Sequence, residues 1–446
     1  MKKTLFVIMA LTVCAAMQAQ QSYTLDQIID SARQNNIALR NAQRSVEAAQ
    51  QQKKEAFTKY FPNVSGTAFW FNANKGMAET EINPSEYMAP ELGATLAKML
   101  PMEALVALSN PVSISMMKDG TIAGINAVQP LFAGGQIIKG NKLAKVGEEV
   151  ANLQLQLSEY EVEKNAEQYF WQIVSLEEKK KTVAAVEAML NDIYKDVDVA
   201  VKAGVVLPND KLQVQLRQNE IESQKLKLNN GISIVKLLLA QYCGLTDTAF
   251  ALTYSTDIDR QSPVPHDHQQ AVTGTAEYQL LGKKVEAEKL QKQMSVGQNL
   301  PTVAVGAGYN YHNLLDENHT FGMIFATVSV PISDWWGGSH ATKRKKIEYQ
   351  QSIDEQHDKE QLLLIRMQNA WNNVEEAYNQ LVIADRSIEQ AEENLRLNRN
   401  YYKAGTSRMT DLLQAQLLYQ QALDQRTDAY AEYQNRLLEY KHAVGE

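Results

Sequence analysis

The sequence has few cysteines, and this excludes a fold held together by disulfides. Of its two cysteines, Cys14 lies in the N-terminal apolar stretch and Cys243 is the only one beyond it. A single thiol cannot form a bridge within the mature chain. Glycine-rich nucleotide loops, serine nucleophile motifs and the His/Glu patterns of zinc enzymes are also lacking. We therefore expect no cofactor, no metal site and no enzymatic activity.

Long hydrophobic runs are lacking after the N-terminus. Residues 1–19 have a basic start followed by an apolar stretch to Met17, which is typical of a cleaved signal peptide and too short to span a bilayer. Lipidation at Cys14 is a less favoured interpretation, because the bulky Val13 precedes it. Without the two signal lysines, 42 basic (44 − 2) and 52 acidic residues leave a net charge of −10. This charge argues against nucleic acid as a partner.

Proline and glycine are scarce (11 and 22 residues) and clustered, which leaves long uninterrupted stretches. Apolar residues recur at steps of seven in two of them: Leu155, Val162, Tyr169, Leu176, Val183 and Leu190, then Met367, Val374, Leu381, Ile388, Leu395 and Tyr402. A strict seven-residue repeat predicts helices that supercoil against their neighbours. We predict long helices at about 136–203, 207–243, 338–403 and 407–444. On this pattern alone, a soluble coiled-coil rod is the favoured interpretation.

The chain contains one unit twice. The Lys-Ala-Gly triplet at 202–204 falls on the same triplet at 403–405, an offset of 201 (403 − 202) that persists without a gap to the C-terminus. Each copy has an amphipathic helical stretch, two short alternating segments, a long helix, a glycine turn and a returning helix. A repeat of this kind constrains the fold, because each copy is expected to form the same structural unit. We predict a first repeat over 20–262 and a second over 263–446.

The alternating segments argue against a plain rod. We predict strands at about 62–73, 120–131, 301–312 and 321–332. One face of the third carries Val303, Val305, Ala307, Tyr309 and Tyr311, and the other is small or polar; Val64, Gly66, Ala68 and Trp70 take the equivalent face of the first. This favours outer-membrane strands over a small soluble sheet. Four strands cannot close a membrane barrel, whose lower limit is about eight, so several chains would have to share one.

Short motifs in both copies carry a family resemblance. In chain order they are Tyr23-Thr24-Leu25-Asp26-Gln27, Phe61-Pro62-Asn63-Val64, Gln129-Pro130-Leu131-Phe132-Ala133-Gly134-Gly135, Leu300-Pro301-Thr302-Val303, Tyr402-Lys403-Ala404-Gly405-Thr406 and Asp411-Leu412-Leu413-Gln414-Ala415-Gln416. Their order and duplication resemble the TolC family of outer-membrane efflux proteins over nearly the whole mature chain.

The resemblance implies a mainly α fold with a small β part, in which long coiled-coil helices are continuous with a transmembrane β-barrel. Four strands per chain would make twelve (3 × 4) in a homotrimer. The implied function is the outer-membrane channel-tunnel of a tripartite efflux or type I secretion system, a passive exit duct for small molecules or proteins. Expected partners are a periplasmic adaptor, an inner-membrane pump and outer-membrane lipid. The expected location is the outer membrane, extending into the periplasm.

The resemblance also implies a periplasmic gate. Gly204 and Gly405 would lie in the tip turns that contact the adaptor. Asp411 matches a position at which the family places a carboxylate facing the lumen, where three copies would favour cations. A second interpretation of Asp411, compatible with the first, is a helix N-terminal residue that accepts from free N–H groups.

Further gate positions are matched less closely. Tyr402 and Asp210 match positions that link neighbouring helices in the closed gate. Ser407 stands where the family has an arginine, with Arg408 one residue later, and Gln414 stands at the second acidic position. We therefore expect a closing network of Asp210, Tyr402, Arg408 and Asp411 at the tip.

Three alternatives remain open. Residues 75–120 form a methionine-containing insertion, interpreted as an extracellular loop with an apolar patch rather than a soft-metal or substrate site, with a short helix between Glu91 and Leu108. His266 and His268 are interpreted as part of a linker rather than a metal site. A soluble periplasmic adaptor or coiled-coil scaffold is the second function considered, although adaptors usually carry one helical hairpin and this chain has two.

Overall fold

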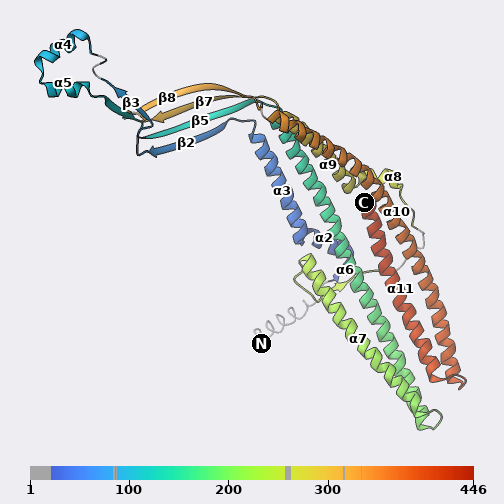
Figure 1. The fold of residues 1–446 in the computed structure, drawn as a ribbon. Coiled ribbons are helices and arrows are strands. Elements are labelled where there is room, and N and C mark those ends of the chain that lie inside the picture. Colours follow the sequence, from blue (N-terminus) through green and yellow to red (C-terminus); the bar gives the residue numbers. More distant parts are fainter. Residues whose placement is uncertain (1–21, 84–85, 87, 257–262, 315–316, 333) are drawn as a thin grey trace, which may run out of the picture. The chain divides into compact units, whose positions relative to one another are not determined.

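The computed structural model describes residues 22–83, 86, 88–256, 263–314, 317–332 and 334–446. It divides into two compact units, each described by itself here: a helical unit of residues 22–50, 146–287 and 350–446, and a strand unit of residues 51–145 and 288–349 (Figure 1). Each unit draws on both halves of the sequence, so the units do not coincide with the predicted repeats. The predicted signal peptide at 1–19 lies outside the described residues.

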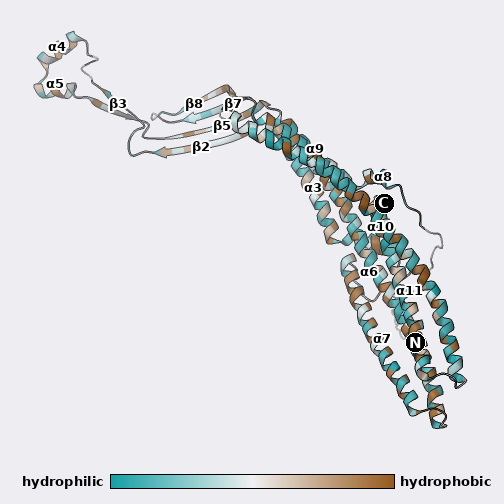
Figure 2. Cartoon of the chain, turned by 45° about the vertical axis from the view of Figure 1, so that its right-hand side comes forward, coloured by the Kyte–Doolittle hydropathy of each residue, from teal (hydrophilic) through white to brown (hydrophobic). Residues whose placement is uncertain are grey.

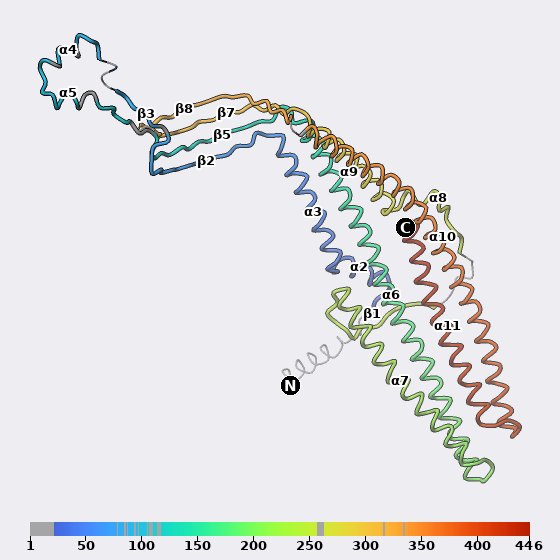
Figure 3. The backbone as a smooth tube through the Cα atoms, viewed as in Figure 1, coloured from blue at the N-terminus to red at the C-terminus, as the bar shows by residue number. Residues whose placement is uncertain are grey.

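Four long helices dominate the chain, and in the helical unit they form two antiparallel pairs (Figure 3). The first pair is α6 (Gln136–Lys202) with α7 (Pro208–Cys243), and the second is α10 (Asp334–Lys403) with α11 (Met409–Val444). Shorter elements are α2 (Leu25–Asn35), α3 (Ile37–Thr58), α8 (His268–Ala271), the 3₁₀ turn η2 (Val272–Gly274) and α9 (Ala276–Gln298). A parallel pair of two-residue strands, β1 (Ser22–Tyr23) and β6 (Ala251–Leu252), completes this list.

The heptad positions form the core of the helical unit. Those buried to at least nine-tenths are Val162, Val183, Leu190, Met367, Val374, Leu381 and Leu395. Figure 2 shows hydrophobic and hydrophilic residues alternating along the four long helices. Burying one such side chain contributes about 1.5–3 kcal/mol, so the seven-residue pattern supplies much of the cohesion between the helices.

The N-terminal elements are attached to this core by caps and close packing. Thr24 caps α2, accepting from the Gln27 N–H at 3.4 Å, while the Gln27 side chain accepts from the Thr24 N–H at 3.0 Å. At the end of α7, Gly244 adopts φ +66°, and a Cβ there would come within 2.7 Å of the Asn35 side chain. Glycine is needed at this position both for its backbone conformation and for the close approach of α2.

The strand unit contains a four-stranded antiparallel sheet in the order β2-β5-β7-β8 (Figure 1). The strands are β2 (Asn63–Asn72), β5 (Asp119–Ala133), β7 (Thr302–His312) and β8 (His319–Ser329). The register of β5 on β7 shifts between Pro130 and Phe132. Proline donates no ladder hydrogen bond, and a bulge at this position lets β5 continue past it.

The insertion contains more structure than the sequence predicts. It forms a hairpin of β3 (Ala78–Ile82) and β4 (Val112–Met116), with α4 (Pro90–Met99) and α5 (Met102–Ser109) between them. The single short helix expected from Glu91 to Leu108 is two helices, because Leu100 is extended before Pro101. A residue that precedes proline disfavours the helical conformation, and this ends α4.

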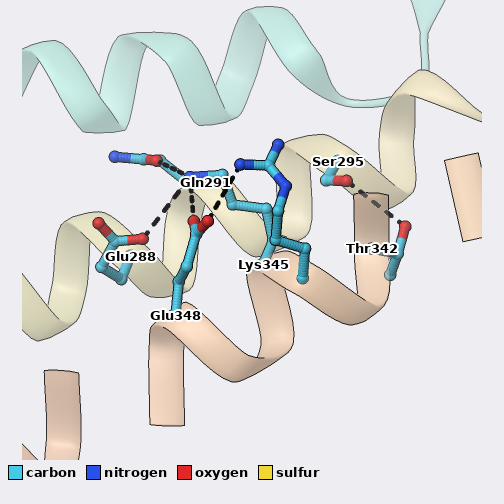
Figure 4. Close-up of polar contacts among 7 residues, drawn as sticks. Glu288, Gln291, Ser295, Thr342, Lys345 and Glu348 are labelled. Carbon is cyan, nitrogen blue, oxygen red and sulfur yellow. Dashed lines mark hydrogen bonds and ion pairs between the residues drawn. The ribbon is translucent and has the colours of Figure 1, made fainter. Parts of the chain in front are cut away.

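Close backbone approaches and polar contacts hold the junction between strands and helices within the strand unit. A side chain at either Gly134 or Gly297 would collide with the backbone of the other, so the two chain segments touch. Between α9 and α10, the Lys345 Nζ donates to Gln291 Oε1 at 2.6 Å and pairs with Glu348 (Figure 4). Among the described residues, no helix is both long and apolar enough to cross a membrane.

Candidate gate at the helical turns

The two turns predicted at the tip share one geometry. Gly204 and Gly405 adopt φ +71° and +72°, the left-handed conformation that glycine reaches without strain. The N–H of Val205 donates to the Ala200 carbonyl at 2.9 Å, and that of Thr406 donates to the Tyr401 carbonyl at the same distance. Each of these hydrogen bonds closes a turn of six residues and satisfies a carbonyl at the end of α6 or α10. The sequence match at an offset of 201 is thus a match of turn structure.

Asp411 acts as a helix-capping residue in the structure. Its Oδ2 accepts from the Arg408 N–H at 3.1 Å and from the Ser407 hydroxyl at 3.2 Å. Asp210 lies at the equivalent place in the first turn of α7, three residues after Leu207. A carboxylate at either place compensates the free N–H groups of a helix N-terminus. Asp411 is exposed, so its capping role leaves part of the carboxylate open to solvent.

Three predicted residues share the exposed face of α11. Arg408, Asp411 and Gln414 follow each other at steps of three and are exposed, whereas Met409 and Leu412 between them are buried in the core. Residues three apart lie on one face of a helix. The structure therefore places them in one line on the surface of the single chain.

Tyr402 lies away from that line, in the core between the helices. Its hydroxyl oxygen is buried and has no hydrogen-bond partner in the described part of the chain. Burial raises the pKa of Tyr402, and the nearby carboxylates of Asp210 and Asp196 raise it further. The single chain thus brings Asp210 near Tyr402 without a hydrogen bond between them, and the four-residue closing network stays a prediction.

The sequence analysis missed a buried polar contact between α7 and α11. Arg217, only 8% exposed, donates from Nε to Gln416 Oε1 at 3.1 Å and from Nη2 to Gln420 Oε1 at 2.8 Å. Its Nη1 contacts Glu220 at 2.7 Å. We call Arg217, Gln416 and Gln420 the buried clasp. A glutamine pair at a spacing of four on a buried helix face is a signal of such a contact, but its partner cannot be read from sequence.

The polar row on α11 continues toward α6 at the same spacing of four. Asp424 Oδ1 is buried without a hydrogen-bond partner among the described residues, and Asp428 accepts from Lys179 at 2.7 Å and from Ser175 at 3.0 Å. Burial raises the pKa of Asp424 to about 6, while Lys179 lowers it and Asp428 raises it. The first-repeat helices are therefore joined to α11 by polar contacts as well as by the apolar core.

Part of the chain resembles a known protein family in sequence. Residues 283–446 match the model of a family described as outer membrane efflux protein. The matched residues lie within the predicted second repeat. No curated protein matches the chain.

Solved structures share the fold at low sequence identity. They include the outer membrane protein VceC from Vibrio cholerae, with a TM-score of 0.72, 16% identity, and coverage of 94% of this chain and 96% of that one. The CmeC outer membrane channel of Campylobacter jejuni has a TM-score of 0.74 and 14% identity, covering 94% and 85%. The MtrE outer membrane channel of Neisseria gonorrhoeae has a TM-score of 0.74 and 14% identity, covering 94% and 88%.

These comparisons bear on several predictions made from the sequence. The fold class is confirmed: long helices with a small sheet in a TolC-like arrangement. The family match over residues 283–446 and the shared fold support the predicted outer-membrane efflux channel, and they do not favour the soluble adaptor. The family is one of channels rather than enzymes.

Proposed function

We propose that this protein is a homotrimeric, passive exit duct of a tripartite efflux or type I secretion system. The observation that carries the proposal is the sheet with two free edges: among the described strands, β2 and β8 each pair on one side only within the sheet. Unpaired edges are not tolerated in lipid. Copies of the chain that pair β8 of one with β2 of the next would remove them, and three copies would give twelve strands (3 × 4).

The trimer and the duct can be tested on the purified full chain. Native mass spectrometry in detergent is expected to show three copies, and planar bilayers are expected to show single-channel conductance. Recovery of the protein in the soluble periplasmic fraction without detergent would contradict the proposal. Monomers that conduct no ions in a bilayer would contradict it as well.

We propose further that the exposed line of α11 borders the periplasmic constriction, with Asp210 and Tyr402 joining the closing network across neighbouring chains. Asp411 is suited to an acidic ring because its carboxylate is exposed while its helix cap fixes its position. Three such carboxylates would attract cations, as charged rings do in other channels. Gln414, one turn further on, would line the same constriction without adding charge.

Two variants at one position separate the charge of Asp411 from its capping role. Asp411→Asn keeps a side-chain oxygen that can accept from the Arg408 N–H but loses the charge, whereas Asp411→Ala loses both. We expect both variants to lower the preference for cations over anions in bilayers. Only Asp411→Ala should also destabilise the start of α11, by about 0.5–2 kcal/mol. An unchanged ion preference in Asp411→Asn would rule out the acidic ring.

The adaptor and pump are proposed at the two glycine turns. Val205, 77% exposed, follows Gly204 directly in the first turn, and Thr406 is the equivalent residue in the second. A photo-reactive residue at either place is expected to cross-link in cells to a periplasmic protein with a helical hairpin. Cross-linking that occurs equally from an exposed residue of the strand unit, such as Met77, would contradict contact at the turns.

A further inference from the structure

Positive charge is concentrated where the helices α3, α6, α9 and α10 adjoin the sheet (Figure 1). The segments of the strand unit that contain these helix ends are 51–62, 134–145, 288–300 and 334–349. Together they have twelve basic and four acidic residues, a net charge of +8 (12 − 4). The rest of the strand unit has three basic and eight acidic residues, a net charge of −5 (3 − 8), and the whole chain has a net charge of −8. We call the twelve basic residues of the four segments the basic belt.

Ion pairs within the belt neutralise little of its charge. Lys345 pairs with Glu348 at 2.6 Å and with Glu288 at 3.8 Å (Figure 4). Arg344 also contacts Glu348, at 3.0 Å, so two of the four carboxylates already have basic partners. Six exposed lysines of the belt form no ion pair with another described residue: Lys54, Lys59, Lys142, Lys289, Lys343 and Lys346. Their positive charge remains available to an anionic partner.

Each of the four helices also has an exposed apolar side chain in the turn nearest the sheet. These side chains are 46% to 77% exposed and belong to Phe57, Ile138, Val296 and Trp336. An exposed lysine lies three, four or seven residues further from the sheet on each helix: Lys54, Lys142, Lys289 and Lys343. Residues at these spacings share one helix face. All four helices therefore repeat one order, with an apolar residue beside the sheet and a basic residue beyond it.

This order matches the boundary between the hydrocarbon of a bilayer and its headgroups. Apolar and aromatic side chains favour the edge of the hydrocarbon, and lysine extends its charge into the headgroup layer. The four lysines lie about 5–10 Å beyond the apolar residues at 1.5 Å per residue, and a headgroup layer is about 5–7 Å thick. The exposed apolar residues would be unfavourable in a water-filled lumen. The face that they share with the lysines is therefore suited to contact with lipid.

We propose that the basic belt is a docking surface for anionic phospholipids of the periplasmic leaflet, whose phosphates the lysines of the four helices hold. The inference rests on the proposed function, because the belt meets this leaflet only when the sheet lies in the outer membrane. Clustered basic residues attract lipids with a net negative charge. A zwitterionic lipid carries a compensating amine beside its phosphate, so the belt is expected to select phosphatidylglycerol over phosphatidylcholine.

The test measures which lipids the full-length protein retains. The protein is incubated in detergent micelles that contain equal amounts of phosphatidylglycerol and phosphatidylcholine with the same acyl chains, repurified and analysed by mass spectrometry. Phosphatidylglycerol is expected to be enriched at least about fivefold, the effect of one basic residue at an anionic surface. Raising the salt from about 0.05 M to about 0.5 M should weaken this enrichment, because salt screens exposed charges.

Two variants of the belt separate charge from packing. The first replaces one lysine of each helix by glutamine: Lys54→Gln, Lys142→Gln, Lys289→Gln and Lys343→Gln. It should lower the enrichment about fivefold or more. The second places arginine at the same four positions, which keeps the charge, and it should retain the enrichment of the wild type. Undiminished enrichment in the glutamine variant would overturn the inference.

Four exposed lysines of the helical unit provide the matched control: Lys180, Lys195, Lys227 and Lys359. Their replacement by glutamine removes the same charge and should leave the enrichment unchanged. Equal loss in the control and the belt variant, or no enrichment in the wild type, would overturn the inference, whereas conductance of the same sample would leave the channel standing. Binding of the wild type to peptidoglycan instead of phosphatidylglycerol would overturn it in favour of the anionic cell wall. Monomers without conductance would instead contradict the proposed channel, and the docking surface with it.

Discussion

Replacement of Arg217 by methionine is the sharpest test of how the two halves of the chain are joined. The guanidinium is 8% exposed and donates to the side-chain oxygens of Gln416 and Gln420, which are 0% and 4% exposed. Methionine fills most of the same volume but donates nothing. The variant would leave two buried amide oxygens without a donor while preserving the packing of α7 on α11.

The size of the effect follows from those two oxygens. Each buried acceptor that loses its only donor costs about 1–3 kcal/mol, whereas loss of the largely exposed contact with Glu220 costs about 0–1 kcal/mol. We expect Arg217→Met to lower the local free energy of opening of α7 and α11 by about 2–7 kcal/mol. Adding Gln416→Leu and Gln420→Leu should recover much of this loss, because an apolar group no longer needs a donor.

Hydrogen exchange of the detergent-solubilised protein measures this directly, since amides of α7 and α11 report local opening. Arg396→Met is the matched control: Arg396 makes two 2.7 Å contacts with Glu393, but both side chains are exposed. We expect an effect below about 1 kcal/mol there. An Arg217→Met variant that exchanges no faster than Arg396→Met would refute the reasoning that burial, rather than contact number, sets the strength of the clasp.

Two further predictions concern pH and the turns. Because the pKa of Asp424 is about 6 in the folded protein and 3.8 ordinarily, protonated Asp424 stabilises the fold at low pH, and this contribution is lost as pH rises through about 6. Between about pH 4.5 and 7.5, the free energy of unfolding of the wild type should fall by about 1–2 kcal/mol relative to that of Asp424→Asn, after allowance for solvent screening. Thermal unfolding of the two proteins with parallel pH profiles would contradict the shifted pKa. Gly405→Ala should destabilise its turn by about 1 kcal/mol because of its φ of +72°, although an added Cβ meets nothing within 4 Å. Gly147 has an ordinary helical conformation, and an added Cβ there also meets nothing within 4 Å, so Gly147→Ala should be neutral or stabilising. Equal changes in thermal stability for Gly405→Ala and Gly147→Ala would show that the backbone conformation of Gly405 does not cause the destabilisation.

The sequence was sufficient for features that depend on local chemistry. The rarity of proline and glycine predicted the long helices, and the glycines at 204 and 405 predicted turns, because both effects act within a few residues. Alternation placed Val64 and Ala307 on one kind of face, and the register shows them in the same row of the sheet. Each of these inferences needed no knowledge of which helices are neighbours.

Features that depend on the choice of neighbour were out of reach. Arg217 contacts residues about 200 positions away, and nothing in a heptad pattern states which helix will face it. The break between α4 and α5 is different, because it follows from the local effect of Pro101 on Leu100 and was nevertheless missed. The capping role of Asp411 was one of two compatible interpretations, and only the position of the Arg408 N–H distinguished it.

The contact between Gly134 and Gly297 bears on how such channels can be recombined. Neither residue has room for a side chain, because each would meet the other's backbone, although one belongs to each half of the sequence. A chimera that joins the first half of this protein to the second half of a relative would keep one glycine and import its counterpart. Unless that relative also has glycine there, the hybrid would meet a collision that neither parent contains. Although the two halves of the sequence are copies of one unit, they can be exchanged between channels only if glycine is kept at both positions of this junction.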